Sequence, residues 1–495
     1  MILTVILFGA NGLAAAATLY FAIESMREKQ PRAFKVGLAI TSALLALAGI
    51  IVMIPSLRMI IAIMMGLGVV FGICFFIPAR PKARSLNGGA GYSVGKVEKF
   101  DERDTIFSRE RWLHPGNEIY DEFYERHPDW KEADDRRRSV GGIFGRLGAI
   151  DCRYAPNNAM VEACAKMALY LALHSHANPD ESVNPEKIDS AKVTEVIKGF
   201  AKHLGADLVG ACKVNPLWVY SHRGRINPQL GHKWGEKIPE PLPYAVVIAT
   251  EMGHDLVATG PHTPGAVESI HLYAKGAYIT TILADWLASL GYRAVAHKTH
   301  SYDAMMVPLA VDAGLGELGR HGYLIADKFG ARVRLFAVTT NMPLMPDSPI
   351  DLGAEVFCER CLKCAEACPS KSIPLGEKMV ERGLLRWKLN PETCYDYWLK
   401  TGTDCSICMG ICPFSRPNTP LHKAVKWFVR RSSLAHFLVP YVDSFLYGRK
   451  WKPREAPHWI DYPRGGKPAE TLDPEKNSPD ERSVRIGKVI KVLSD

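Results

Sequence analysis

The stretch Cys358-Glu-Arg-Cys361-Leu-Lys-Cys364-Ala-Glu-Ala-Cys368-Pro369 decides the fold of this chain. Its cysteines follow the spacing C-x2-C-x2-C-x3-C-P, and a second run with the spacing C-x2-C-x3-C-P ends at Pro413. Three thiolates at C-x2-C-x2-C spacing surround one [4Fe–4S] cluster, whereas the fourth cysteine of such a run ligates the other cluster. The sequence therefore predicts two [4Fe–4S] clusters, held by eight of the 12 cysteines.

This crossed pattern assigns four thiols to each cluster. The first cluster is predicted to be held by Cys358, Cys361, Cys364 and Cys412. The second is predicted to be held by Cys368, Cys394, Cys405 and Cys408, with a longer internal gap than the simplest two-cluster ferredoxins have. Zinc knuckles and a disulfide framework are the alternatives. Zinc sites do not require the C-x3-C-P endings, and disulfides are unusual in a cytosolic segment.

The overall composition excludes few classes of protein. The 495 residues are enough for two or more domains, and 61 basic against 52 acidic residues leave a net charge of +9. This mild excess fits nucleic-acid binding or simply a membrane topology, so the charge alone decides nothing. The hydrophobic fraction of 47% averages over two different parts, because the first eighty residues are far more apolar than the rest.

Three uncharged apolar stretches near the N-terminus are each close to the ~20 residues that a membrane-spanning helix requires. They are Ile2–Ile23, Val36–Ile54 and Met59–Ile77. Basic residues lie between the first two stretches and after the third: Arg27, Lys29, Arg32, Lys35, Arg80, Lys82 and Arg84. The positive-inside rule predicts a multi-pass protein of the cytoplasmic membrane, with the N-terminus outside and everything after residue 80 cytoplasmic. A cleavable export signal is the alternative, but no basic n-region or twin arginine precedes the first stretch.

The middle of the chain alternates helical and extended patterns. Lys192–Leu204 predicts an amphipathic helix, Tyr244–Thr250 a buried strand and Ala266–Leu290 a long helix, which together indicate an α/β or α+β core. Before this core, the glycines of Ser85–Tyr92 predict a flexible linker, and the charges of Lys96–Arg138 predict a solvated, partly helical segment. We expect five parts: a three-helix transmembrane anchor (1–84), a linker and N-terminal segment (85–149), a cofactor-binding catalytic core (150–350), a ferredoxin-like domain (351–420) and a C-terminal segment that packs on the core and ends in a polar tail (421–495).

Gly314-Leu-Gly316-Glu-Leu-Gly319 matches the dinucleotide-binding pattern G-x-G-x-x-G. A Rossmann turn follows a clear strand and has an acidic residue about 20 positions further on. Here 308–312 is a poor strand, and the acidic residues Asp327 and Asp347 fall too near and too far. The glycines are better explained by a backbone that lies flat against another large cofactor.

The order of motifs resembles the corrinoid-dependent reductive dehalogenases. The resemblance runs from about Phe100 to Tyr447 and is carried by the glycine turn, by 330–335 and 340–344, and by the paired cysteine runs. It implies a nitroreductase-like α/β cobalamin-binding core joined to a ferredoxin-like domain with two [4Fe–4S] clusters. The implied cobalamin is base-off, which agrees with the lack of an Asp-x-His-x-x-Gly motif in the sequence. Its predicted contacts are Gly314, Gly316 and Glu317.

The resemblance also implies a catalytic pair. The family's proton donor is a tyrosine on the helix before Leu-Gly-Tyr, which corresponds to Tyr273, and its basic partner corresponds to Arg334. A phenol has an ordinary pKa of about 10, so a guanidinium beside it eases proton release by stabilising the phenolate. Tyr278 and Arg332 are the rival candidates. His297 and His300 lie where relatives line the pocket with polar groups, although a satisfied loop histidine is an equal explanation.

The membrane spans depart from the family pattern. Respiratory members are exported by a twin-arginine signal and held by a separate small membrane protein, whereas this chain resembles a fusion of anchor and catalyst. The electron donor is then expected to be a quinol-oxidising membrane partner, a ferredoxin or a flavodoxin. A bilayer and a small organohalide are the other expected partners, and no nucleic acid is expected.

Taken together, these features predict a reductive dehalogenase that replaces halogen by hydrogen with two electrons and one proton. One alternative is an epoxyqueuosine reductase, which shares the cofactors but is soluble and uses an aspartate as its acid. A second alternative is a membrane ferredoxin that only relays electrons. That protein would not need residues 150–350, whose length fits a complete cofactor domain.

Overall fold

The computed structural model describes residues 2–78, 84–143, 145, 147–150, 154–226, 230–299 and 301–462. The chain forms two compact units. The first unit comprises Met1–Lys82, Leu352–Lys363 and Arg416–Lys452. The second comprises Ala83–Asp351, Cys364–Ser415 and Pro453–Asp495. The five parts expected from the sequence are a finer division than this one and remain predictions.

Three long apolar helices form the core of the first unit. They are α1 (Ile2–Arg27), α2 (Pro31–Met53) and α3 (Arg58–Cys74), and each is long and apolar enough to cross a membrane. Helices α1 and α2 pack closely: a Cβ added at Gly37 would meet the Cβ of Ala22 at 2.9 Å. The amide of Asn11 donates to the carbonyl of Leu44 at 2.7 Å, so this polar side chain serves the helix pair.

The same unit contains α12 (Ala354–Arg360), α16 (Pro420–Arg431) and α17 (Ser433–Tyr447). Helix α17 packs on α2, α12 and α16. The expectation that residues 421–495 pack on the catalytic core remains a prediction. Helices α16 and α17 carry large apolar side chains that meet the ends of the apolar helices.

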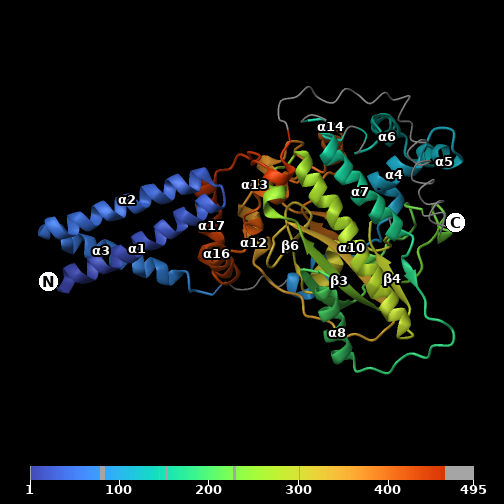
Figure 1. The fold of residues 1–495 in the computed structure, drawn as a ribbon, viewed down its shortest axis with the longest axis horizontal. Helices are drawn as coiled ribbons and strands as arrows, with labels where there is room; N and C mark the ends of the chain where they lie inside the picture. Colours follow the sequence, from blue (N-terminus) through green and yellow to red (C-terminus); the bar gives the residue numbers. More distant parts are fainter. Residues whose placement is uncertain are drawn as a thin grey trace. The chain divides into compact units, whose positions relative to one another are not determined.

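A five-stranded antiparallel sheet organises the second unit (Figure 1). Its spatial order is β1-β4-β7-β3-β2. The strands are β1 (His176–Ala177), β2 (Leu208–Lys213), β3 (Tyr244–Glu251), β4 (Ala294–His297) and β7 (Val333–Thr340). Alternate residues of β3 face opposite sides, as a pleated strand requires: Val246 and Ile248 join one apolar cluster, whereas Val247 and Ala249 join the other. The predicted mixed α and β fold is confirmed.

Helices cover both faces of this sheet. Helices α8 (Ser190–His203) and α10 (Thr263–Ser289) cover one face, and the short α11 (Met306–Asp312) covers the other. Helix α10 lies unusually close to β7, because a Cβ added at Gly276 would meet the ring of Phe336 at 2.2 Å. This close approach fixes the distance between the helix and the strand one turn from Tyr273.

Several residues between 85 and 140 pack into the second unit. The backbone amide of Gly89 donates to Asp312 at 2.7 Å, and Tyr92 is buried. Further along, α4 (Ile106–Trp112), α5 (Glu118–Arg126) and α6 (Pro128–Val140) form a helical layer. This segment is partly helical, as expected, but several of its charged side chains are buried rather than solvated, because charged side chains at helical spacing can be buried when each finds an opposite charge.

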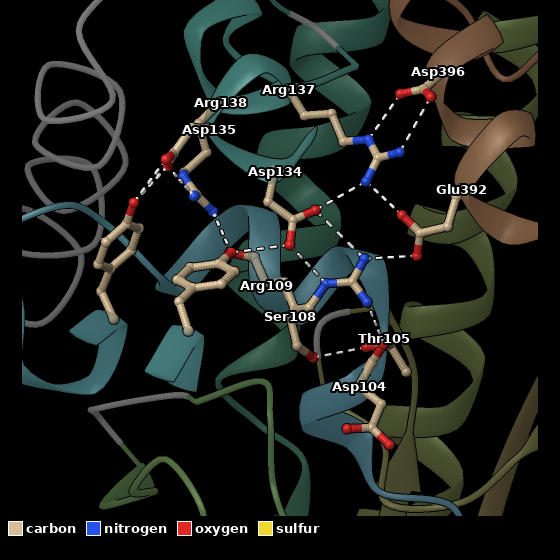
Figure 2. Close-up of polar contacts among 12 residues, drawn as sticks. Asp104, Thr105, Ser108, Arg109, Asp134, Asp135, Arg137, Arg138, Glu392 and Asp396 are labelled. Carbon is tan, nitrogen blue, oxygen red and sulfur yellow. Dashed lines mark hydrogen bonds and ion pairs between the residues drawn. The ribbon is translucent and has the colours of Figure 1, made fainter. Parts of the chain in front are cut away.

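Figure 2 shows how these charges are paired. The guanidinium of Arg109 donates to Asp134 at 2.9 Å and to Glu392 at 2.6 Å, and Arg137 donates to Asp396 at 2.8 Å. Arg137 also reaches Asp134 at 2.9 Å, so each arginine bridges two elements. The network joins α4 and α6 to α14 (Pro391–Thr401), which carries Cys394.

Candidate functional site

Tyr273 and Arg334, predicted from the sequence as a pair, lie together on α10 and β7. The guanidinium carbon of Arg334 is 5.2 Å from the centroid of the Tyr273 ring. Arg334 also donates to Ser269 Oγ and, at 2.5 Å, to Asp404 Oδ2. Burial alone lowers the pKa of Arg334, but the neighbouring Tyr273 and Asp404 outweigh it and raise this pKa. The guanidinium is therefore held in its charged form beside the phenol.

The two rival residues lie elsewhere. Tyr278 is 48% exposed, on a different side of α10 from Tyr273. Arg332 is buried, where it donates to the carbonyl of Ser415 at 2.7 Å and to Glu251 at 2.9 Å. Position thus favours Tyr273 and Arg334, whose catalytic roles remain predictions.

A second tyrosine near this pair was missed by sequence reasoning. The guanidinium carbon of Arg225 lies 3.9 Å above the ring of Tyr302, and Arg225 donates to the Tyr302 hydroxyl. Burial raises the pKa of Tyr302, and the nearby Tyr273 raises it further. The carboxylate of Glu102 in turn binds Arg225 and accepts a hydrogen bond from its Nε at 2.9 Å. The position of Tyr302, two residues after His300, was the available signal in the sequence, but its partner Arg225 is 77 residues away.

Of the two histidines predicted to line the pocket, the structure describes only His297. His297 is buried; its Nε2 is 2.9 Å from Thr339 Oγ1, and its Nδ1 accepts from the amide of Asp303 at 3.2 Å. Burial lowers the pKa of His297 to about 4, so the ring is neutral. Both ring nitrogens are occupied, which fits a structural histidine. His300 lies outside the described residues.

The glycine motif forms a turn and a hairpin, not a strand-to-helix turn. Gly314 has a φ of +70° after α11, and β5 (Gly316–Leu318) pairs with β6 (Leu324–Ala326). A Cβ at Gly316 would meet the carbonyl oxygen of Ile325 at 2.1 Å, so the chain's own backbone requires this glycine. Glu317 is 1% exposed. Contact of these residues with a cofactor remains a prediction.

Four thiols of the predicted second cluster gather in the second unit. They are Cys368, Cys394, Cys405 and Cys408, and no disulfide joins them. Burial raises the pKa of both Cys394 and Cys405 to about 12, and neighbouring thiols add to the rise. Buried thiolates at close range are stable only beside compensating positive charge, which iron supplies. This donor set therefore fits an iron–sulfur cluster.

The other predicted set is divided between the two units. Cys358 and Cys361 belong to the first unit, whereas Cys364 and Cys412 belong to the second. All four are buried. Their assignment to one cluster remains a prediction from the sequence spacing.

The predicted cluster thiols of the second unit and the Tyr273–Arg334 pair are connected through Asp404 and Tyr323. Asp404, which binds Arg334, directly precedes Cys405. The hydroxyl of Tyr323 interacts electrostatically with Cys408 and with Arg334, and Tyr323 packs with Cys408 in one apolar cluster. The thiols predicted to bind the second cluster and the predicted Tyr273–Arg334 pair therefore share neighbouring residues in this unit.

Buried polar atoms in this region have no partner in the part of the chain that the structure describes. They are Arg334 Nε, Thr250 Oγ1 and His321 Nε2. Thr250 is the β3 residue opposite Arg334 in the sheet register, and burial lowers the pKa of His321 to about 4. Buried groups of this kind are costly unless a ligand or ordered water satisfies them. They are consistent with a polar, partly buried cofactor.

Comparisons with known proteins agree with this geometry. The model of a 4Fe-4S dicluster domain matches residues 357–415, which include all eight predicted cluster ligands. The tetrachloroethene reductive dehalogenase of Sulfurospirillum multivorans is 32% identical over 297 residues, which are 54% of this chain and 59% of that protein. The corresponding enzyme of Desulfitobacterium hafniense is 28% identical over 57% of this chain and 60% of its own length. The chain is therefore a relative of the reductive dehalogenases, as its motifs predicted, and it spans less than two thirds of the length of these relatives.

A solved structure gives the same result for the fold. The catabolic reductive dehalogenase NpRdhA matches with a TM-score of 0.57 at 22% identity, over 76% of this chain and 53% of that one. The epoxyqueuosine reductase of Listeria monocytogenes is similar over a shorter region, at 29% identity over 29% of this chain and 38% of its own length.

Proposed function

We propose that this protein is a membrane-anchored reductive dehalogenase. The observation that carries the proposal is the Tyr273–Arg334 pair beside the Asp404–Cys405 loop, in a relative of the reductive dehalogenases. The net reaction consumes an organohalide, two electrons and one proton, and yields the hydrogenated product and halide. An organohalide substrate is also supported by NpRdhA, whose structure was solved with 3-bromo-4-hydroxybenzoic acid.

The required cofactors are a base-off cobalamin and two [4Fe–4S] clusters. Arg334 Nε, Thr250 Oγ1, His321 Nε2 and the β5–β6 hairpin with Glu317 are the groups that fit the corrinoid. When bound and reduced, the corrinoid supplies the electron pair that breaks the carbon–halogen bond. The eight cysteines described above supply the ligands of the clusters.

The chain's own residues manage the proton. Tyr273 holds it on its hydroxyl oxygen and gives it to the carbon that loses halide. Arg334 stabilises the resulting phenolate, and Ser269 and Asp404 fix the direction of the guanidinium. Since Asp404 carries the opposite charge, it also limits how strongly Arg334 binds an anionic group, so that halide can leave and the Tyr273 phenolate can regain a proton from solvent.

The anchor places this chemistry at the cytoplasmic membrane. Basic residues between α1 and α2 support a topology with the N-terminus outside and the second unit in the cytoplasm. Electrons then come from a quinol-linked membrane partner, a ferredoxin or a flavodoxin. Fusion of a reporter that folds only in the cytoplasm to residue 462 tests the topology: activity there supports it, and an inactive reporter contradicts it.

The decisive experiment combines metal analysis with halide release. The full chain is purified anaerobically in detergent from cells supplied with cobalamin, and cobalt, iron and corrinoid absorbance are measured. We expect roughly one cobalt and eight irons per chain. Halide release from chlorinated alkenes and brominated phenols, with a low-potential reductant, then tests the activity. Iron without any corrinoid would leave only an electron-relay protein.

A further inference from the structure

Helices α16 and α17 form a surface that the dehalogenase proposal does not use. We name the segment Pro420–Tyr447 the collar. It lies in the first unit, at the end of the three apolar helices where α1 ends, α2 begins and α3 ends (Figure 1). The Tyr273–Arg334 pair belongs to the second unit.

Aromatic contacts join the collar to the ends of the apolar helices. Phe76, just beyond α3, packs edge-on against Phe428 with centroids 5.5 Å apart and against Trp427 at 6.3 Å. Phe21 of α1 meets Tyr447 in the same way at 6.5 Å. Bulky aromatic residues are enriched where membrane helices leave the hydrocarbon region. The collar therefore lies at the depth of the lipid headgroups if the apolar helices span the bilayer.

Polar contacts fix the same arrangement. Arg32, in the first turn of α2, donates to the carbonyl of Phe445 at 2.9 Å. His422 Nε2 is 2.9 Å from Glu28, in the turn between α1 and α2. These bonds hold α16 and α17 across the end of the apolar helices rather than parallel to them.

The outer side of the collar is apolar. Along α17, the side chains of Phe437, Tyr441, Val442 and Phe445 are each about half exposed or more, and their spacing places them on one face. On α16, Trp427 is 42% exposed. A soluble protein seldom exposes so many large side chains together unless they contact a partner or a membrane.

The charges of the collar favour a phospholipid surface as that partner. Pro420–Tyr447 contains one acidic residue, Asp443, which is buried and paired with Lys363 and Arg416. Exposed basic residues such as Lys423 lie on α16, and the guanidinium carbon of Arg431 is 4.6 Å from the ring of Trp427. An amphipathic helix with basic and aromatic residues is typical of binding to anionic headgroups.

We propose that α16 and α17 lie in the headgroup region of the membrane, with the exposed face of α17 toward the acyl chains and the basic residues of α16 on anionic phosphates. This inference rests on the proposed membrane insertion of α1–α3, but not on dehalogenase activity. A second copy of the chain, or a membrane-embedded partner protein, would be the competing occupant of the same face.

Lipid photolabelling tests the proposal on the full, cofactor-loaded chain. The protein is placed in nanodiscs of phosphatidylcholine and phosphatidylglycerol with a phosphatidylglycerol analogue that carries a diazirine near its glycerol. After illumination, adducts are mapped by mass spectrometry. We expect adducts in α1–α3 and also on the exposed face of α17, and none at Val196, which is 44% exposed on α8 of the second unit.

Variants sharpen the result. Tyr441→Glu with Val442→Glu is expected to reduce α17 adducts by roughly tenfold, because acidic side chains are repelled by anionic headgroups and are costly near acyl chains. Val196→Glu is the matched control and leaves the map unchanged. Corrinoid and iron contents report whether each variant folds; if the double variant does not, the wild-type map alone decides.

Three outcomes overturn the proposal. Adducts in α1–α3 without any on α16 or α17 mean that the collar is off the bilayer. A photoreactive amino acid introduced at Tyr441 that cross-links to a second copy or to another protein, and not to lipid, assigns the face to a protein partner. Absence of adducts in α1–α3 refutes the membrane insertion on which the inference rests, while halide release measured separately still tests the dehalogenase.

Discussion

Two buried arginine sites in the second unit, one around Arg109 and Arg137 and one around Arg334, differ in how completely their charges are paired. Around Arg109 and Arg137, both guanidinium groups bind carboxylates on two elements, and Asp134 accepts from both arginines (Figure 2). Arg334 instead has one carboxylate, one hydroxyl and a tyrosine ring, and its Nε has no partner among the described residues. The saturated network holds elements together, whereas the incomplete one leaves bonding capacity for a ligand.

The largest effect is expected at the incomplete site. Tyr273→Phe removes the proton donor, and general acid catalysis is typically worth about 100-fold to 10,000-fold in rate. Halide release should fall by that range, with cobalt and iron contents unchanged. The control is Tyr278→Phe, on the same helix but 48% exposed, which should retain full activity. Equal losses in both variants would contradict the assignment of Tyr273.

The saturated network should respond in stability instead. Asp134→Asn leaves Arg109 and Arg137 with less compensating charge, and breaking a buried ion pair typically costs about 3–5 kcal/mol. The thermal midpoint of unfolding in detergent should fall clearly, while halide release per cofactor-loaded enzyme stays near wild type at low temperature. A surface control is Glu122→Gln, whose partner Arg126 is half exposed. A large loss of activity without loss of stability would place this network in catalysis.

Arg334→Lys tests the geometry of the incomplete site at constant charge. Lysine cannot contact Asp404, Ser269 and the Tyr273 ring in one plane, so we expect roughly a 100-fold loss in halide release. The pH dependence of kcat should change as well, because the guanidinium no longer stabilises the phenolate. Arg332→Lys is the neighbouring control: since Arg332 binds Ser415 and Glu251, its loss should appear mainly in stability. If Arg332→Lys instead loses activity and Arg334→Lys loses mainly stability, the roles assigned to the two arginines would be exchanged.

The smallest effect concerns a satisfied buried histidine. The pKa of His297 is about 4 in the folded protein and about 6.5 when unfolded, so the unfolded chain binds more protons between these values. Stability contributed by the neutral ring is therefore present above pH 6.5 and falls as the pH drops toward 4, by about 2 kcal/mol at pH 5. Unfolding midpoints at pH 5 and 7.5 should differ less in His297→Gln than in wild type. An unchanged difference would mean that other groups carry the pH dependence.

The sequence predicted what local spacing determines. The cysteine runs and the three apolar stretches are contiguous patterns, and the family resemblance supplied Tyr273 and Arg334, which the fold brings together from residues 61 positions apart. The sequence did not predict the burial of Arg109 and Asp134 or the packing of Gly89 on Asp312, because these contacts depend on partners far along the chain. Tyr302 was missed for the same reason: its arginine, Arg225, carries no local motif.

The bond between Arg334 and Asp404 has a further consequence for assembly of the enzyme. Asp404 directly precedes Cys405, so under the proposed cluster assignment the loop that binds iron also carries the carboxylate that contacts Arg334. Under that proposal, binding of iron to Cys405 would fix the position of Asp404 and, through it, of Arg334 beside Tyr273. Assembly of the proposed metal centre and orientation of the proposed proton donor would then depend on the same loop.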